Sequence, residues 1–181
     1  MSIKKKTSLP WVIAATVVFI AMMIIVRGSG LGNAKLTEIG GGSGMIDLEY
    51  GYTAEKAYSM IEDYGAEGRT FYLRRVIPAD IVFGLSYLLC FTLLIRYLLQ
   101  SLDVRPKART LYALPVLMLA FDWAENSCVA VMLRKFPETL TGLCAVSNWM
   151  TIWKFVFTLG TAVVILTLGA MAAVRHFKKK A

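Results

Sequence analysis

Charged and polar side chains lie inside two stretches that otherwise have the composition of membrane helices. Asp122, Glu125 and Asn126 interrupt the stretch LYALPVLMLAFDWAENSCVAVML, and Lys154 interrupts the stretch LCAVSNWMTIWKFVFTLG. Carboxyl groups beside an amine and an amide can bind a ligand, coordinate a cation or transfer a proton. An ionised side chain inside a bilayer costs about 2.5–3.5 kcal/mol on the insertion scale, so we expect these groups to face one another rather than lipid.

The position of each group along its helix predicts that the acids and the amine meet. Asp122 lies about eleven residues before the end of its apolar stretch, and Lys154 lies about eleven residues after the start of the next one. At about 1.5 Å per residue, both lie roughly 16 Å from the same membrane surface. The predicted ligand-binding or buried polar cluster, drawn from three helices, consists of Asp80, Asp122, Glu125, Asn126, Ser147, Asn148, Thr151 and Lys154.

The charge balance of this cluster is unequal. It holds three acids and one amine, so ionisation of all four groups would leave two negative charges without partners. We expect either protonation of Glu125 or Asp122, or an inward turn of Arg74 or Arg75. One buried ion pair would be enough to fix the register of two helices, whereas this larger cluster favours a functional pocket open to the outer side.

No metal or cofactor is expected from the spacing of these residues. The acids lack a neighbouring His or Cys ligand, and their spacing matches no metal motif. The glycine-rich stretches RGSGLGN and IGGGSGM lack the Gly-Lys-Ser/Thr of a phosphate loop. Trp123, Trp149 and Trp153 flank the cluster and are expected either to wall the pocket or, for Trp149, to anchor in the membrane interface.

Four apolar stretches can carry these residues across a membrane. The chain has 181 residues, of which 57% are hydrophobic and 18% are charged, whereas a soluble domain has about 25% charged residues. Since about 20 apolar residues cross a bilayer, we predict an all-α membrane protein with four transmembrane helices in an antiparallel bundle. Residues 1–181 form a single integral membrane domain, with transmembrane segments at 9–26, 76–99, 111–133 and 143–174.

The outer segment, residues 27–75, is the largest part predicted to lie outside the membrane. YTAEKAYSMIEDYG predicts an amphipathic outer helix between the first and second transmembrane helices, with Thr53 as N-cap and Gly65 at its end. The glycine-rich stretches before it predict a flexible connector. MIDLEYGY alternates between apolar and polar residues and predicts a short extended piece.

Basic residues set the predicted orientation. The net charge is +8, and Lys and Arg in short segments favour the cytoplasmic side. Eleven basic residues share one side if the chain crosses four times: Lys4, Lys5, Lys6, Arg96, Arg105, Lys107, Arg109, Arg175, Lys178, Lys179 and Lys180. We therefore predict a multi-pass protein of the cell (inner) membrane with an uncleaved first helix and both termini in the cytoplasm. The expected partners are membrane lipids and either a second copy of the chain or another membrane protein, and nucleic acid is not expected.

The three cysteines do not form a redox motif. Cys90, Cys128 and Cys144 contain no C-x-x-C pair, so a thiol oxidoreductase is not favoured. Cys128 and Cys144 both fall near the outer ends of their helices, and a bridge between them stays open because geometry decides it.

Several segments resemble those of uncharacterised prokaryotic four-helix integral membrane proteins, a family without an assigned activity. These segments are YTAEKAYSMIEDYGAEGRTFYL, the helix start at Asp80, FDWAEN and SNWMTIWK. The resemblance covers most of the chain beyond the first helix. It implies a four-helix architecture and draws attention to Asp122, Glu125, Asn126 and Lys154, but it implies no substrate.

Three functions fit this sequence. The one we favour is a small multi-pass membrane protein that binds a ligand, a lipid or a partner through the polar pocket. An enzyme acting on a lipid or isoprenoid, with Glu125 or Asp122 as acid/base, lacks an evident nucleophile and cofactor motif. A proton- or cation-translocating subunit would need an oligomer, since four helices leave little room for a path. Whether the chain is an enzyme stays open.

Overall fold

The computed structural model describes residues 7–28, 30–103 and 110–180, and over these residues it is helical without a strand. Four helices are long and apolar enough to cross a membrane. The prediction of an all-helical chain with four helices of membrane length is therefore confirmed for the described residues. These helices are α1 (Leu9–Gly28), α5 (Ile77–Leu102), α6 (Ala113–Lys135) and α7 (Thr141–Lys180).

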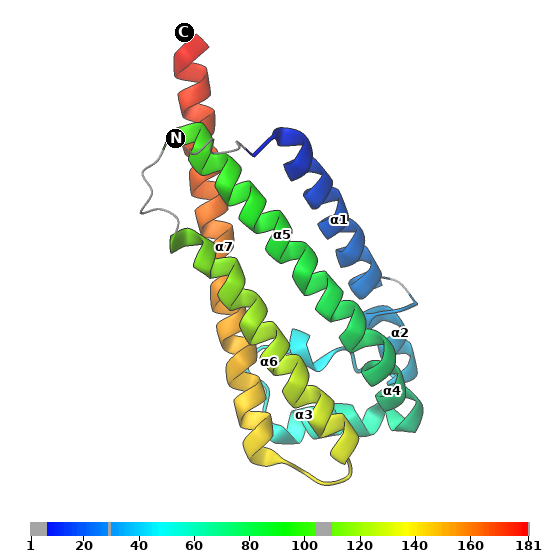
Figure 1. Ribbon diagram of the computed structural model, residues 1–181. Helices are drawn as coiled ribbons and strands as arrows, with labels where there is room; N and C mark the ends of the chain where they lie inside the picture. The colour runs from blue at the N-terminus through cyan, green and yellow to red at the C-terminus, as the bar shows by residue number, and fades with distance from the viewer. Residues whose placement is uncertain (1–6, 29, 104–109, 181) are drawn as a thin grey trace, which may run out of the picture.

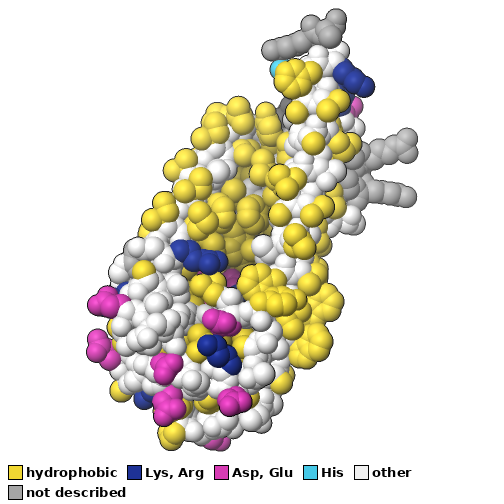
Figure 2. Space-filling model, turned by 180° about the vertical axis from the view of Figure 1, so that it is seen from behind, with side chains coloured by type: hydrophobic (Ala, Val, Ile, Leu, Met, Phe, Trp, Pro, Cys, Tyr) yellow, Lys and Arg dark blue, Asp and Glu magenta, His cyan; other side chains and the backbone are white. Residues whose placement is uncertain are grey.

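The long helices pack side by side over much of their length (Figure 1). α6 packs against α7, α1 packs mainly against α5, and α5 also contacts α6 and α7. In Figure 1, α1 and α6 run toward one end of the molecule, whereas α5 and α7 run away from it. Figure 2 shows hydrophobic side chains along the length of these helices, with charged side chains gathered toward the ends.

A group of short helices covers one end of the long ones. We call residues 30–71 the cap, and in Figure 1 the cap lies at the end opposite the C-terminus of α7. The cap contains α2 (Asn33–Ile39), the 3-10 helix η1 (Ile46–Leu48), α3 (Ala54–Asp63) and α4 (Gly65–Phe71). The π-helix η2 (Tyr72–Val76) then leads into α5.

The position of Pro78 explains the π-helix before α5. Proline lacks an N–H and its ring clashes with the carbonyl four residues earlier, here that of Arg74. The wider π turn at Tyr72–Val76 accommodates both effects without ending the helix. The chain therefore continues directly into α5 and places Asp80 in the first turn of this helix.

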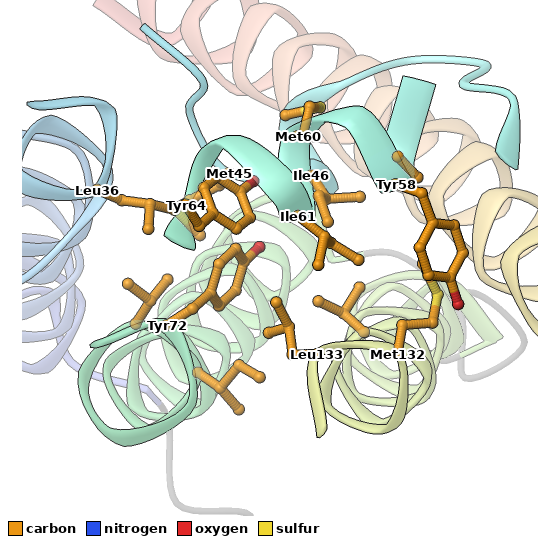
Figure 3. Packing of buried hydrophobic residues seen from close by; sticks show 14 of the residues in the cluster. Leu36, Met45, Ile46, Tyr58, Met60, Ile61, Tyr64, Tyr72, Met132 and Leu133 are labelled. Carbon is orange, nitrogen blue, oxygen red and sulfur yellow. The ribbon is translucent and has the colours of Figure 1, made fainter. Parts of the chain in front are cut away.

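The cap has an apolar core of its own, which also includes the ends of α6 and α7 that face it. Leu36, Ile46 and Ile61 are fully buried in this core, and each buried side chain of this size contributes roughly 1.5–3 kcal/mol. Figure 3 shows them packed with Met132 and Leu133 of α6. The cap is thus attached to the long helices by apolar contacts of the kind found in soluble proteins.

The prediction of a flexible glycine-rich connector is wrong. Gly41 and Gly42 have positive φ angles of 58° and 117° and form a tight turn after α2. A Cβ on Gly32 would lie 1.9 Å from the carbonyl oxygen of Val26, so this glycine allows two chain segments to approach closely. The glycines serve backbone geometry, and the residues around them are packed into the cap.

The prediction of an extended piece at MIDLEYGY is also wrong, because residues Ile46–Leu48 form the 3-10 helix η1. Met45, Ile46 and Asp47 are buried consecutively, which a strand with one buried face does not allow. The N–H of Met45 donates to Asn33 Oδ1 at 2.7 Å and fixes the start of this turn.

The expected start and end of the outer helix are found in α3. Thr53 Oγ1 accepts a hydrogen bond of 3.2 Å from the N–H of Lys56, and Gly65 has a φ of 57°. The N-cap satisfies one free donor of the first turn. Gly65 then allows the chain to turn from α3 into α4.

Candidate functional site

The ammonium group of Lys154, on α7, lies among carboxyl groups from separate parts of the chain. Its Nζ is 2.6 Å from Glu125 Oε2, 3.4 Å from Asp122 Oδ1 and 3.4 Å from Asp47 Oδ2. It also donates to the backbone carbonyl of Asp47 at 3.1 Å. The exposed fraction is 7% for Lys154 and at most 4% for the three acids, so this ion-pair network is shielded from solvent and from lipid.

A fourth acid, Asp80 of α5, completes what we call the charged centre: Asp47, Asp80, Asp122, Glu125 and Lys154. Asp80 Oδ2 accepts a hydrogen bond of 2.7 Å from Asn126 Nδ2. The residues of the centre come from the cap, α5, α6 and α7. The centre therefore joins the cap to three of the long helices.

Hydroxyl groups donate to the acids from several sides. Tyr87 donates to Asp122 Oδ2 at 3.0 Å, and Tyr72 donates to Asp47 Oδ1 at 3.3 Å. Thr151 donates to Glu125 Oε1. Buried carboxyl groups require such partners, because an unpaired buried polar group loses its hydration without compensation.

Most of the residues predicted for the polar cluster lie together. Asp80, Asp122, Glu125, Asn126, Thr151 and Lys154 belong to the network described above. Ser147 is buried one turn from Thr151 and accepts a hydrogen bond of 2.8 Å from the Tyr52 hydroxyl. Asn148 is half-buried, and its Oδ1 has no hydrogen-bond partner among the described residues.

Asp47 was not among the residues predicted for the polar cluster. Depth in a membrane can be derived from helix rise only for residues within the apolar stretches, whereas Asp47 comes from the segment between them and reaches Lys154 because the cap folds over the bundle. The burial of its neighbours Met45 and Ile46 is what brings it inward.

Tyr52, Tyr72 and Tyr87 were missed as well. For Tyr87 a signal was present, because it follows Asp80 by seven residues and so shares its helix face. The burial of Tyr52 raises its pKa to about 12, so its hydroxyl stays protonated at neutral pH and is available as the donor to Ser147.

Two further expectations are wrong. Arg74 and Arg75 are exposed and do not turn inward to neutralise the acids. The tryptophans do not wall a pocket, because the exposed fractions of Trp123, Trp149 and Trp153 are 38%, 59% and 44%. All three rings are exposed, as expected for side chains that contact lipid or the membrane interface.

The charge imbalance is larger than the sequence suggested. Four acids against one amine would leave three uncompensated negative charges if every group ionised. Removing charges from water costs several kcal/mol per ion, and attraction compensates this only when charges are balanced. The centre therefore requires additional positive charge, either protons on its carboxyl groups or a bound cation.

Three of the acids have the geometry to share a hard cation. Asp47, Asp80 and Asp122 each offer a carboxylate oxygen, and these oxygens lie within 4.8 Å of one another. Oxygens that ligate one Ca²⁺ at about 2.3–2.6 Å lie at most about 5 Å apart. The set combines a cap residue with residues of α5 and α6, which is why spacing along the sequence did not reveal it.

The cysteines take no part in the centre. Cys90, Cys128 and Cys144 are all free, so the bridge left open between Cys128 and Cys144 is not formed.

Comparison with protein-family models, with curated proteins and with solved structures finds no match for this chain. The function of this chain must therefore be inferred from the chemistry of the charged centre.

Proposed function

We propose that this chain is an integral membrane protein that binds a small positively charged ligand, an inorganic cation or an organic ammonium, at the charged centre. The observation that carries the proposal is the presence of four buried acids around one amine. An anionic group, such as a lipid phosphate, would meet an excess of like charge there. A cation would instead receive carboxylate oxygens, which are the ligands that hard cations prefer.

A purely structural role accounts less well for this composition. The pair of Lys154 and Glu125, 2.6 Å apart, already links α7 to α6. Each further buried acid adds desolvation cost without adding an amine. Ionisable groups within membrane segments generally mark binding sites or transport paths, and the centre has more acids than helix register requires.

The other two functions find less support in the geometry. Apolar clusters around Met118 and Leu119, and around Ile95 and Leu168, lie between the centre and the opposite end of the bundle. They favour binding at one end over translocation through a single copy. For an enzyme, Glu125 or Asp122 would act as acid/base, and both are already paired with Lys154.

For the topology, we propose an antiparallel bundle of four crossings in the plasma membrane, with the cap outside and both termini in the cytoplasm. α3, with Ala57 and Ile61 buried and Glu55 and Glu62 exposed, then serves as the amphipathic outer helix. Exposed Arg96 and half-buried Arg175 support the orientation from the opposite end of the bundle. Several basic residues used for the prediction, Lys4, Lys5, Lys6, Arg105, Lys107 and Arg109, lie outside the described residues.

The test is cation-dependent stabilisation of the purified protein in lipid nanodiscs after treatment with a chelator. We expect Ca²⁺, Mg²⁺, Mn²⁺ or methylammonium to raise the apparent Tm of the wild type, because a ligand that binds only the folded state stabilises it. Comparing the inorganic ions with methylammonium shows whether the ligand is an inorganic cation or an organic ammonium. Asp47→Asn should weaken the effect at least tenfold in cation concentration, since it removes one carboxylate of the centre.

Glu49→Gln is the matched control. It removes one carboxylate two residues further along the same cap loop, where Glu49 is exposed, and should leave the cation response unchanged. If no cation stabilises the wild type more than Asp47→Asn, the centre is neutralised by protons alone and the proposed function is rejected.

A further inference from the structure

The part of the cap nearest to Lys154 is a short segment, residues 47–52, which we call the lid and which consists of the last two residues of η1 and the turn that follows. It follows the buried residues Met45 and Ile46 and ends just before α3. Asp47 at its start contacts Lys154 through both its side chain and its carbonyl. A ligand that arrives from the cap side therefore meets the lid before it meets the acids.

The two ends of the lid, Asp47 and Tyr52, are buried with exposed fractions of 4% and 6%, whereas its middle is exposed. Met45 and Ile46 are 2% and 0% exposed, so they anchor the preceding chain in the cap core. Glu49, Tyr50 and Gly51 are exposed, and Leu48 is half-buried. Segments with few buried apolar contacts open locally at lower free energy than the core around them.

The exposed Tyr50 ring meets the Phe155 ring of α7 edge to face, with 5.7 Å between the ring centroids. Polar contacts at two positions also hold the lid against the long helices. One joins Asp47 to Lys154 and to the Tyr72 hydroxyl. The other is the hydrogen bond of 2.8 Å from Tyr52 to Ser147 of α7. Gly51, immediately before Tyr52, has a φ of 71°, a conformation that glycine adopts readily and that lets the chain turn sharply at this point.

We propose that the lid opens to admit the ligand and closes over it, that Asp47 is the ligand-binding group it delivers, and that the Tyr52–Ser147 hydrogen bond is its latch. This inference rests on the proposed function for the identity of the ligand, but the movement of the lid is a property of the chain itself. The lid moves separately from α3. The buried residue Ile46 fixes the chain on one side of it, and the N-capped start of α3 fixes the chain on the other side.

The experiment is hydrogen–deuterium exchange of the full-length protein in nanodiscs, comparing wild type with Tyr52→Phe. This change removes only the latch hydroxyl and leaves every acid of the centre in place. Losing one net hydrogen bond should raise the exchange rate of the amides in residues 47–52 by about 2- to 10-fold. The amides of α3 and α7 should not change.

Tyr58→Phe is the matched control, since the Tyr58 hydroxyl accepts a hydrogen bond of 2.7 Å from the N–H of Leu140 and so also joins the cap to the chain between α6 and α7. It should leave exchange in the lid unchanged. If the lid and α3 exchange faster together in Tyr52→Phe, or if the lid does not respond, the separate lid is refuted.

A second measurement connects the lid to the ligand. By stopped flow, the association and dissociation rates of Mn²⁺ or methylammonium should both rise by about 2- to 10-fold in Tyr52→Phe, with Kd unchanged, because the latch is present in both the free and the bound closed states. Unchanged rates, or a change in only one of the two rates and hence in Kd, would refute the latch. Absence of binding by all of Ca²⁺, Mg²⁺, Mn²⁺ and methylammonium would reject the proposed function and leave the exchange result to decide the lid.

Discussion

At the scale of single residues, Lys154 is the group on which the charged centre depends most directly. Its ammonium contacts Asp47, Asp122 and Glu125, all of them buried. Lys154→Met should destabilise the protein by about 3–5 kcal/mol, because removing one partner leaves buried charges uncompensated. The measurement is thermal unfolding in nanodiscs.

The double variant Lys154→Met with Asp122→Asn provides the control for this prediction. It also removes one of the acids that lost its partner, so it should recover part of the stability lost in Lys154→Met. A single variant as stable as the wild type, or a double variant less stable than the single one, would contradict the electrostatic account of the centre.

Residue depth along helices was predictable from the sequence, and contacts made by the cap were not. Asp122 and Lys154 could be placed at the same level because a helix advances by a fixed rise per residue, and their atoms lie 3.4 Å apart. Asp47 could not be placed this way, because it lies in the short helix η1 of the cap, which is not continuous with any of the long helices. Its position depends on how Met45 and Ile46 pack, which is a tertiary property.

At the scale of elements, the glycines of the cap have different roles that the sequence alone does not separate. Gly30 and Gly32 stand two residues apart, yet a Cβ on Gly30 would meet nothing within 4 Å, while one on Gly32 would meet the carbonyl of Val26. Gly32→Ala should therefore force α1 and α2 apart and destabilise the protein by about 1–3 kcal/mol. Gly30→Ala, measured alongside it by thermal unfolding, should be neutral, and equal effects of the two changes would contradict this assignment.

Elements with strong local signals were predicted well, and those fixed by long-range contacts were not. α3 begins after Thr53 and is followed by Gly65 as its capping pattern indicates. α2 has seven residues and lies between glycines, and a helix this short is unstable without tertiary contacts. Leu36, which is fully buried in the cap core, supplies such contacts, and the sequence around it indicated only a connector.

At the scale of the whole molecule, the cap and the long helices place their apolar side chains in two different ways. The cap buries an apolar core against the ends of the long helices, as a soluble domain does. The long helices instead expose apolar side chains such as Ile24, Leu89 and Leu159 along their length, which is favourable only in lipid. The charged centre lies where these two regions meet, so a change in the cap can reach the membrane helices through Asp47.

Because the cap and the last turns of α7 lie at opposite ends of the molecule, its orientation in the membrane can be tested by labelling an exposed residue at each end. Glu62 lies exposed on α3 of the cap, and Lys178 lies exposed in the last turns of α7. In intact cells, a membrane-impermeant maleimide should label Glu62→Cys and should label Lys178→Cys only after the membrane is permeabilised. The unmodified protein, whose three cysteines are buried or half-buried, gives the background. Labelling of Lys178→Cys in intact cells, with Glu62→Cys protected, would invert the topology, and the charged centre would then take its ligand from the cytoplasm.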